Sequence, residues 1–263
     1  MTVQIYSTVE KMGVAAAAHG AEKICQAITE RGCANIIIAT GASQFAMLSE
    51  LIKNPCIDWS KVTMFHLDEY VGLPESHPAS FRKYIKERVI AKLPKPLKAA
   101  HFVDGSNPDP KKACKELGEI LAKHPIDACF IGIGENGHIA FNDPPANFDT
   151  EEAYLVVDLD EACRKQQMGE GWFPTINDVP KQAISMAPRQ IMKSKAIINT
   201  VPDARKADAV KITIEGELRP EHPASIVRIH PDCVTFLDTA SAAKLSKITK
   251  DLCTCSSNCC GSC

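Results

Sequence analysis

Hydrophobic residues along the chain fall into two kinds of segment, short continuous runs and longer stretches with helical spacing. Runs that are apolar throughout suit strands covered on both faces of a sheet. Five segments have this character: Asn35–Ala39, Val62–Leu67, Ala128–Ile133, Ala196–Val201 and Cys233–Leu237. Between them, apolar residues at helical spacing predict the helices Val9–Arg31, Ser43–Lys53, Ser80–Leu93, Pro110–Lys123 and Arg205–Glu215.

This alternation of strands and helices predicts parallel strands joined by crossover helices. We therefore predict an α/β fold over residues 1–250, a single doubly wound (Rossmann-like) domain with a mostly parallel sheet flanked by helices. Asp109 and Pro110 suit the cap and first position of one helix. The irregular segment 143–180, punctuated by Pro, Asn, Asp and Gly, is predicted to be a lid. Ligands of such a fold bind at the C-terminal ends of the strands.

The overall charge narrows the class of partner. Thirty basic and 32 acidic residues give a net charge of −2, which offers no reason to expect nucleic acid or an anionic membrane as partner. No stretch reaches the about 18 consecutive apolar residues of a membrane helix. The first residues, Met1 to Tyr6, lack the features of a signal peptide. A cytoplasmic location is predicted.

The chain has 12 cysteines, a number more typical of oxidised, secreted scaffolds. Seven are scattered, several in apolar segments, where cysteine acts as a small core residue. The other five lie in the tail 251–263: Cys253, Cys255, Cys259, Cys260 and Cys263. We expect a reduced body. The tail has enough thiols to bind zinc or copper(I), but its spacing is not that of a zinc ribbon. A bound metal and a disordered redox-active appendage are both open, and neither has a catalytic role.

The turn after the first predicted strand is built of small residues, Thr40-Gly41-Ala42-Ser43, and precedes Gln44 and a helix. Small residues let the backbone approach an anion, and free N–H groups at a helix start favour a phosphate. The turn carries neither a Walker lysine nor the GxGxxG fingerprint. A phosphate site and a plain tight turn are equally compatible with this segment.

Two adjacent carboxylates, Asp68 and Glu69, close the second predicted strand. Neighbouring residues of an extended chain point to opposite sides, so one can face a cleft while the other faces packed structure. A carboxylate in a cleft can remove a proton from a carbon next to a carbonyl or imine. A solvated turn, or a carboxylate that braces backbone N–H groups, is the alternative interpretation.

A glycine-rich loop follows the third predicted strand and contains His138, with Asp143 five residues further on. Histidine can give and take protons near neutral pH. A carboxylate bonded to one ring nitrogen fixes the tautomer and raises the basicity of the other nitrogen. A lone histidine is more often structural, but one within a flexible loop and near carboxylates is a candidate acid or base.

At these three segments the sequence resembles the glucosamine-6-phosphate deaminase/isomerase family, which is related to the 6-phosphogluconolactonases. The resemblance covers most of residues 1–250 and rests on three blocks in the family's order: Thr40-Gly41-Ala42-Ser43, Asp68-Glu69-Tyr70-Val71-Gly72-Leu73 and Gly137-His138-Ile139-Ala140-Phe141-Asn142. It implies an enzyme that converts glucosamine 6-phosphate and water to fructose 6-phosphate and ammonia, without a metal or organic cofactor. The implied partner is a phosphorylated amino sugar, and a homo-oligomer is expected.

The resemblance also implies residue roles. Asp68 is the base that shuttles a proton between C2 and C1 of the sugar, and His138, oriented by Asp143, assists ring opening. The Thr40–Gln44 turn and Lys206 hold the phosphate. We count Glu69 and Gly137 with the substrate-binding residues, although Glu69 also suits a role in holding its loop.

The chain departs from the family around the histidine. The aspartate usual two residues before it is Asn136, with Glu135 displaced by one, and the usual glutamate is Asp143. We therefore include Glu135 and Asn136 among the catalytic candidates. The segment 160–173 aligns poorly with the family segment that carries a phosphate-binding arginine, for which Arg164 is the candidate.

Three other functions are open. Lactonases of this fold usually have Asp-Glu-Arg and Gly-His-Thr-Ala-Ser blocks, so Tyr70 and Ile139 at the corresponding positions favour a deaminase. Galactosamine 6-phosphate is a plausible substrate in place of its C4 epimer. A non-catalytic sugar-phosphate sensor keeps the phosphate site but has no need of Asp68.

Overall fold

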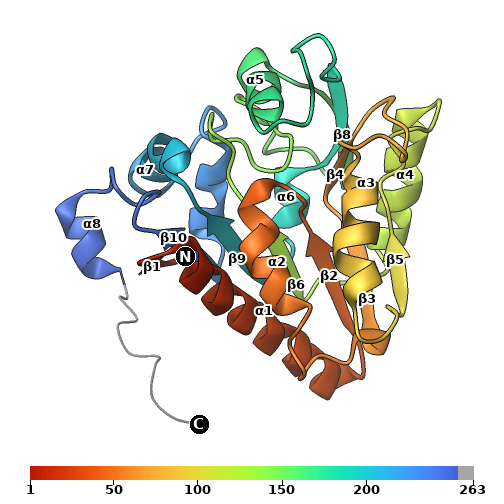
Figure 1. The fold of residues 1–263 in the computed structure, drawn as a ribbon, viewed down its shortest axis with the longest axis horizontal. Coiled ribbons are helices and arrows are strands. Elements are labelled where there is room, and N and C mark those ends of the chain that lie inside the picture. Colours follow the sequence, from red (N-terminus) through yellow and green to blue (C-terminus); the bar gives the residue numbers. More distant parts are fainter. Residues whose placement is uncertain (254–263) are drawn as a thin grey trace.

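The computed structural model describes residues 1–253 and is built around a seven-stranded sheet in which every neighbouring pair is parallel (Figure 1). The strand order is β1-β10-β9-β6-β2-β3-β5. The strands are β1 (Thr2–Tyr6), β2 (Ala34–Ile38), β3 (Val62–His66), β5 (Ala99–His101), β6 (Ala128–Ile131), β9 (Ala196–Val201) and β10 (Cys233–Asp238).

Helices join these strands. The α-helices are α1 (Val9–Arg31), α2 (Phe45–Leu51), α3 (Phe81–Tyr84), α4 (Pro110–Leu121), α5 (Glu161–Gly169), α6 (Pro188–Ile191), α7 (Ala207–Glu215) and α8 (Lys247–Leu252). A π-helical segment, Ile85–Val89, and a 3-10 turn, Ile90–Lys92, continue α3. Further 3-10 turns are Ala42–Gln44, Trp59–Lys61, Ala204–Lys206 and Pro223–Ile229. The predicted start of α4 is confirmed, because Asp109 Oδ1 accepts a hydrogen bond from the Lys112 N–H at 3.0 Å.

Both faces of the central sheet are covered, because successive residues of each strand point to opposite sides. Ile36 and Ile38 of β2 pack into a core with α1 and α2, whereas Ile37 packs into a second core with α4 and α6. This two-sided burial explains why the inner strands are apolar throughout. The fold is the predicted doubly wound α/β arrangement.

The direction of winding reverses between β2 and β6. From β2 the chain proceeds outward to β3 and β5, and from β6 it proceeds outward to β9 and β10. The two strands are neighbours, with Ile36 paired to Ala128, yet their continuing loops diverge. A crevice forms outside the carboxyl ends of strands at such a switch point and is where ligands bind in open α/β sheets.

A smaller antiparallel sheet stands over that end of the molecule (Figure 1). Its order is β4-β8-β7, and its strands are β4 (Asp68–Tyr70), β7 (Tyr154–Asp158) and β8 (Gln182–Met186). The predicted lid segment, 143–180, thus contains β7 and α5 rather than irregular chain alone. The sheet ties this segment to β4, the strand that begins with Asp68.

The five predicted strands are all present in the central sheet, within a few residues of their expected ends. The prediction missed the edge strands β1 and β5 and the whole small sheet. The seven scattered cysteines are free thiols in the structure, as expected for a reduced body. Within these residues no helix is long and apolar enough to cross a membrane. The predicted metal-binding or redox role of the tail concerns cysteines that, apart from Cys253, lie outside the described residues.

Candidate active site

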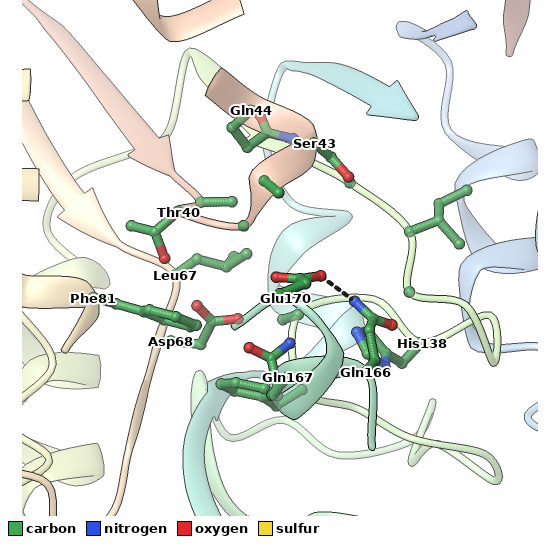
Figure 2. Close-up of a pocket in the computed structure, with 18 of the residues that line it drawn as sticks. Thr40, Ser43, Gln44, Leu67, Asp68, Phe81, His138, Gln166, Gln167 and Glu170 are labelled. Carbon is green, nitrogen blue, oxygen red and sulfur yellow. Dashed lines mark hydrogen bonds between the residues drawn. The ribbon is translucent and has the colours of Figure 1, made fainter. Parts of the chain in front are cut away.

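One cavity lies at the switch point and is lined by segments that are far apart in the sequence (Figure 2). Its walls come from the turn after β2, the start of β4, the loop after β6, the helix α5 and the 3-10 turn before α7. The polar side chains among its lining residues belong to Thr40, Ser43, Gln44, Asp68, His138, Gln166, Gln167, Glu170 and Lys206. The proposed base, the proposed histidine and the proposed phosphate-binding residues therefore share one cavity.

Asp68 sits at the bend where the chain leaves the central sheet for the small one. The Leu67 N–H donates to Ile38 O at 3.2 Å, and Leu67 O accepts from the Met186 N–H at 3.0 Å, so the bend is fixed on both sides. The Asp68 side chain is 6% exposed, and no hydrogen-bond donor of the described chain reaches its carboxylate. Burial, and then the charge of neighbouring Glu69, raise the pKa of Asp68 to about 8. This group faces the cavity and is more basic than an ordinary carboxylate.

The imidazole of His138 is held from behind by a hydrogen-bond network. His138 Nδ1 lies 3.0 Å from Asp143 Oδ1, and Asn136 Nδ2 donates to the same oxygen at 2.9 Å. Burial raises the pKa of Asp143, but the hydrogen bonds from His138, Asn136 and the Asp160 N–H outweigh it and leave that pKa below its usual value. Because the ionised Asp143 requires a donor at Nδ1, the other ring nitrogen, Nε2, is left as the one that can accept a proton.

Asn136 explains a departure that the sequence alone left open. Its Nδ2 also donates to Asp160 Oδ2 at 3.0 Å, so one amide bridges two carboxylates. Its Oδ1 accepts from the His138 N–H at 3.1 Å. An aspartate here would add a third carboxylate and remove the donor, which costs free energy through like-charge repulsion. The amide therefore suits the pair Asp143 and Asp160.

The histidine loop depends on backbone that only small residues can adopt. A Cβ atom on Gly134 would lie 2.3 Å from the His138 ring, so only glycine leaves room for the imidazole. Gly137 has a φ of 85°, and Ala140 has a φ of 53°, which is unusual for a residue with a side chain. Strain of this kind is found where a loop is held in one shape for function.

The turn after β2 offers an unsatisfied hydroxyl to the cavity. Thr40 Oγ1 is buried and has no hydrogen-bond partner. The turn is rigid, because Gln44 Nε2 donates to Ile131 O at 2.8 Å and to Thr200 Oγ1 at 2.7 Å, which ties β2, β6 and β9 together. A buried hydroxyl without a hydrogen-bond partner costs free energy of folding, unless a ligand supplies the missing partner.

Lys206 supplies the positive charge of the cavity. It is 4% exposed and takes part in none of the ion pairs of residues 1–253. Burial lowers its pKa. Asp203 caps the 3-10 turn Ala204–Lys206 that carries this lysine, and its own φ is 85°. The Asp203 N–H donates to Asp238 Oδ1 at 3.1 Å, and its carboxylate accepts from the Arg205 N–H at 2.9 Å. A buried ammonium without a carboxylate partner suits an anionic ligand.

The helix α5 and its C-cap add three residues that the sequence analysis missed: Gln166, Gln167 and Glu170. Figure 2 shows them on the side of the cavity opposite Thr40, with Gln167 near Asp68. Tyr70 OH donates to Gln167 Oε1 at 2.6 Å, which anchors the helix to β4. Their spacing, i and i+3 or i+4, is helical, but polar residues at this spacing also mark any exposed helix face, so the sequence carried no distinct signal for them.

Several predicted site residues lie elsewhere. Glu69 is fully buried on the other side of β4 and accepts hydrogen bonds from Ser80 and from backbone N–H groups, so it holds a loop and does not line the cavity. Glu135, Asn136, Gly137 and Asp143 lie behind His138 and are not among the lining residues. Arg164, the candidate phosphate ligand, donates to the carbonyl groups of Ile176 and Val179 and does not line the cavity.

His138, Asp143 and Cys163 place a ring nitrogen, a carboxylate oxygen and a sulfur within 4.8 Å of one another. Metal-binding sites use such atoms. Here the Asp143 carboxylate already accepts from His138, Asn136 and the Asp160 N–H, and Asn136 directs an N–H group at it. These donors use three of the about four acceptor sites of the carboxylate, so the residues fit a hydrogen-bond network better than a metal site.

Comparison with known proteins identifies the family. The model of a family described as glucosamine-6-phosphate isomerases/6-phosphogluconolactonase matches residues 7–236. A glucosamine-6-phosphate deaminase of Streptococcus pyogenes serotype M49 (strain NZ131) is 38% identical over 215 residues, covering 82% of this chain and 89% of the relative. A glucosamine-6-phosphate deaminase of Streptococcus thermophilus (strain ATCC BAA-491 / LMD-9) is 37% identical over 214 residues, covering 81% of this chain and 89% of the relative.

Solved structures agree with this result. A monomeric glucosamine-6-phosphate deaminase has a TM-score of 0.84 at 29% identity, covering 92% of this chain and 99% of that one. A 6-phosphogluconolactonase from Trypanosoma brucei has a TM-score of 0.76 at 17% identity, covering 93% of this chain and 98% of that one. This likeness shows a shared fold. The chain belongs to the glucosamine-6-phosphate isomerase/6-phosphogluconolactonase family.

Proposed function

We propose that this protein is a glucosamine-6-phosphate deaminase, which converts glucosamine 6-phosphate and water to fructose 6-phosphate and ammonia. The observation that carries the proposal is that Asp68, His138 and Lys206 line the same cavity. The names of the relatives at 37 and 38% identity support the same reaction.

The chemistry needs two proton movements. The sugar ring first opens, and His138 Nε2 moves the proton between the ring oxygen and the C1 hydroxyl. Asp68 then takes the proton from C2 of the open-chain aldose and returns it to C1, while the C1 oxygen gains a proton and the amine loses one, which gives the 2-imine of fructose 6-phosphate. Water adds at C2 and ammonia leaves. A base with a pKa of about 8 is well matched to a carbon acid of this kind.

Lys206 and the Thr40 hydroxyl are the groups that we assign to the 6-phosphate. Lys206 contributes charge, and the orphaned hydroxyl contributes a donor. Anchoring the phosphate holds the open chain beside Asp68, so that proton transfer needs no separate encounter.

Lactone hydrolysis is the reaction to separate from this one, because the 6-phosphogluconolactonases share the fold. Hydrolysis of an ester needs an activated water and a phosphate site but no base at C2. The raised pKa of Asp68, away from hydrogen-bond donors, favours the deaminase. Amino-sugar catabolism, a cytoplasmic location and a homo-oligomeric state stay predictions that rest on the resemblance.

The direct test measures ammonia release from glucosamine 6-phosphate beside hydrolysis of 6-phosphogluconolactone, with the same purified full-length protein. We expect ammonia and fructose 6-phosphate in equal amounts, and no acceleration of lactone hydrolysis. Faster lactone hydrolysis without ammonia would refute the proposal. Galactosamine 6-phosphate, assayed in parallel, tests the choice of C4 epimer.

A further inference from the structure

Glu170, the residue that caps the C-terminus of the lid helix α5, places a negative charge in a cavity that, under the proposed function, also binds a phosphate. Glu170 lines the cavity and is half-buried, and among the ion pairs of residues 1–253 none uses its carboxylate. In Figure 2 it lies between Asp68 and His138, across from Thr40. The charge of this carboxylate acts on Lys206, the cation of the same cavity.

Glu170 is held in this position. Gln166 Nε2 donates to Glu170 Oε1 at 3.0 Å, and Gln166 Oε1 accepts from the Glu135 N–H at 2.9 Å. The next residue of the helix, Gln167, is anchored by Tyr70 at 2.6 Å. The Glu170 carboxylate is therefore held at the cavity by hydrogen bonds that connect this segment to the histidine loop and to β4.

This arrangement is unfavourable for a ligand that carries only a phosphate. A carboxylate close to the phosphate repels it and weakens the attraction of Lys206. A ligand that also carries a cation offsets the charge of Glu170. A hexosamine phosphate does so, because its amine is protonated at neutral pH.

We propose that Glu170 forms a subsite for the ammonium group of the substrate, which makes it the residue that selects amino sugars over neutral sugar phosphates. This inference rests on the proposed function and deepens it. The amine is attached to C2, the carbon whose proton Asp68 removes, so it must lie in the cavity that Asp68 and Glu170 both line.

The subsite has a second consequence for the base. An ammonium group bound beside Asp68 favours the ionised carboxylate, which lowers the pKa from its value in the empty cavity. The substrate thus helps to generate the base that it needs. A neutral sugar phosphate brings no such charge.

Two inhibitors that differ only in the amine test the subsite: 2-amino-2-deoxyglucitol 6-phosphate and glucitol 6-phosphate, with binding to the full-length protein measured by calorimetry. We expect the wild-type protein to bind the amine roughly 10- to 100-fold more tightly, as for one charge-assisted hydrogen bond. Glu170→Gln should lose this preference and bind glucitol 6-phosphate as tightly as the wild type or more so.

Glu135→Gln is the charge-matched control. Glu135 also acts on the charge of Lys206, but it lies outside the cavity, 3.5 Å from Arg205. This variant should keep the preference for the amine. If both variants lose it equally, net charge and not a subsite sets the preference, and the inference is wrong.

The inference and the proposed function fail separately. If the wild-type protein releases ammonia from glucosamine 6-phosphate but Glu170→Gln keeps the amine preference, the subsite is refuted and the deaminase stands. If no ammonia is released but Glu170→Gln abolishes the preference, the subsite stands and the deaminase is refuted.

Discussion

Asp68 and Glu69 are adjacent carboxylates on one short strand, and they face two different regions of the molecule. Asp68 faces the cavity, where no donor of the described chain reaches it. Glu69 faces the packed interior, where it accepts from Ser80 Oγ at 2.8 Å and from the Arg82 N–H at 2.9 Å. The N–H groups of Tyr70 and Phe81 also donate to it.

The difference shows that hydrogen bonds, rather than burial, separate a catalytic carboxylate from a structural one. Burial raises the pKa of both groups, but the donors around Glu69 oppose it, whereas Asp68 has only burial and a neighbouring negative charge. Around Glu69, hydrogen-bond donors satisfy the carboxylate and hold the surrounding loop in place. Around Asp68 no such donors are present, so its carboxylate is more basic.

The largest effect is expected from Asp68→Asn, which removes the base and keeps the shape of the side chain. Turnover of glucosamine 6-phosphate should fall by roughly 10²- to 10⁴-fold, the usual contribution of a positioned acid or base. Binding of glucitol 6-phosphate should persist, because the phosphate contacts are untouched. Steady-state kinetics and calorimetry measure the two quantities. Turnover close to that of the wild type would mean that Asp68 is not the base.

A smaller effect, on stability and not on chemistry, is expected from Glu69→Gln. The amide N–H₂ would face donors that now point at a carboxylate, so we expect a loss of about 3 kcal/mol in the free energy of unfolding, measured by denaturant titration. Glu75→Gln is the matched control, since Glu75 forms an exposed ion pair with Lys86 at 2.7 Å and should cost less than about 1 kcal/mol. Equal losses in the two variants would contradict the structural role of Glu69.

The smallest effect concerns the pH dependence of stability. Because burial raises the pKa of Asp68 to about 8 in the folded protein, the folded state holds a proton that the unfolded state has lost above about pH 4. Stability from this group therefore falls as pH rises, and between pH 7 and 9 the fall amounts to about 1.4 kcal/mol.

Thermal unfolding of the wild type and Asp68→Asn at both pH values tests this prediction. The variant lacks the titrating carboxyl, so its stability should fall less than that of the wild type over the same range. Parallel curves for the two proteins would place the pKa of Asp68 outside this window.

The central sheet was predictable because its inner strands are buried on both faces. Segments such as Asn35–Ala39 need no partner to be recognised as buried strands, since their residues are apolar on both sides. The edge strand β5 is only half-buried and three residues long, so it carries no such pattern. The small sheet was missed because β4 consists of Asp68, Glu69 and Tyr70, polar residues that become a strand only by pairing with β8.

The candidate site was predictable where an acidic residue, a histidine or a small-residue turn directly follows a buried strand in the sequence. Asp68, His138 and the turn at Thr40 follow three buried strands and do line the cavity. The contribution of α5 was not predictable, because polar residues of a lid helix have the same pattern as polar residues of any exposed helix face. For the same reason the sequence could not show that Arg164, the candidate phosphate ligand, donates to backbone carbonyl groups of the lid and is not among the lining residues.

The sequence by itself determined that Asp68, His138 and the turn at Thr40 follow buried parallel strands. A strand that is buried on both faces is apolar at every position, and this pattern can be recognised without knowing its neighbours. It did not determine which side of a strand, or of a helix, meets the ligand. That was decided by the tertiary structure, which turned Asp68 toward the cavity and Glu69 away, and brought Glu170 over the same space. Which donors reach which carboxylate depends on chain segments that only folding brings together.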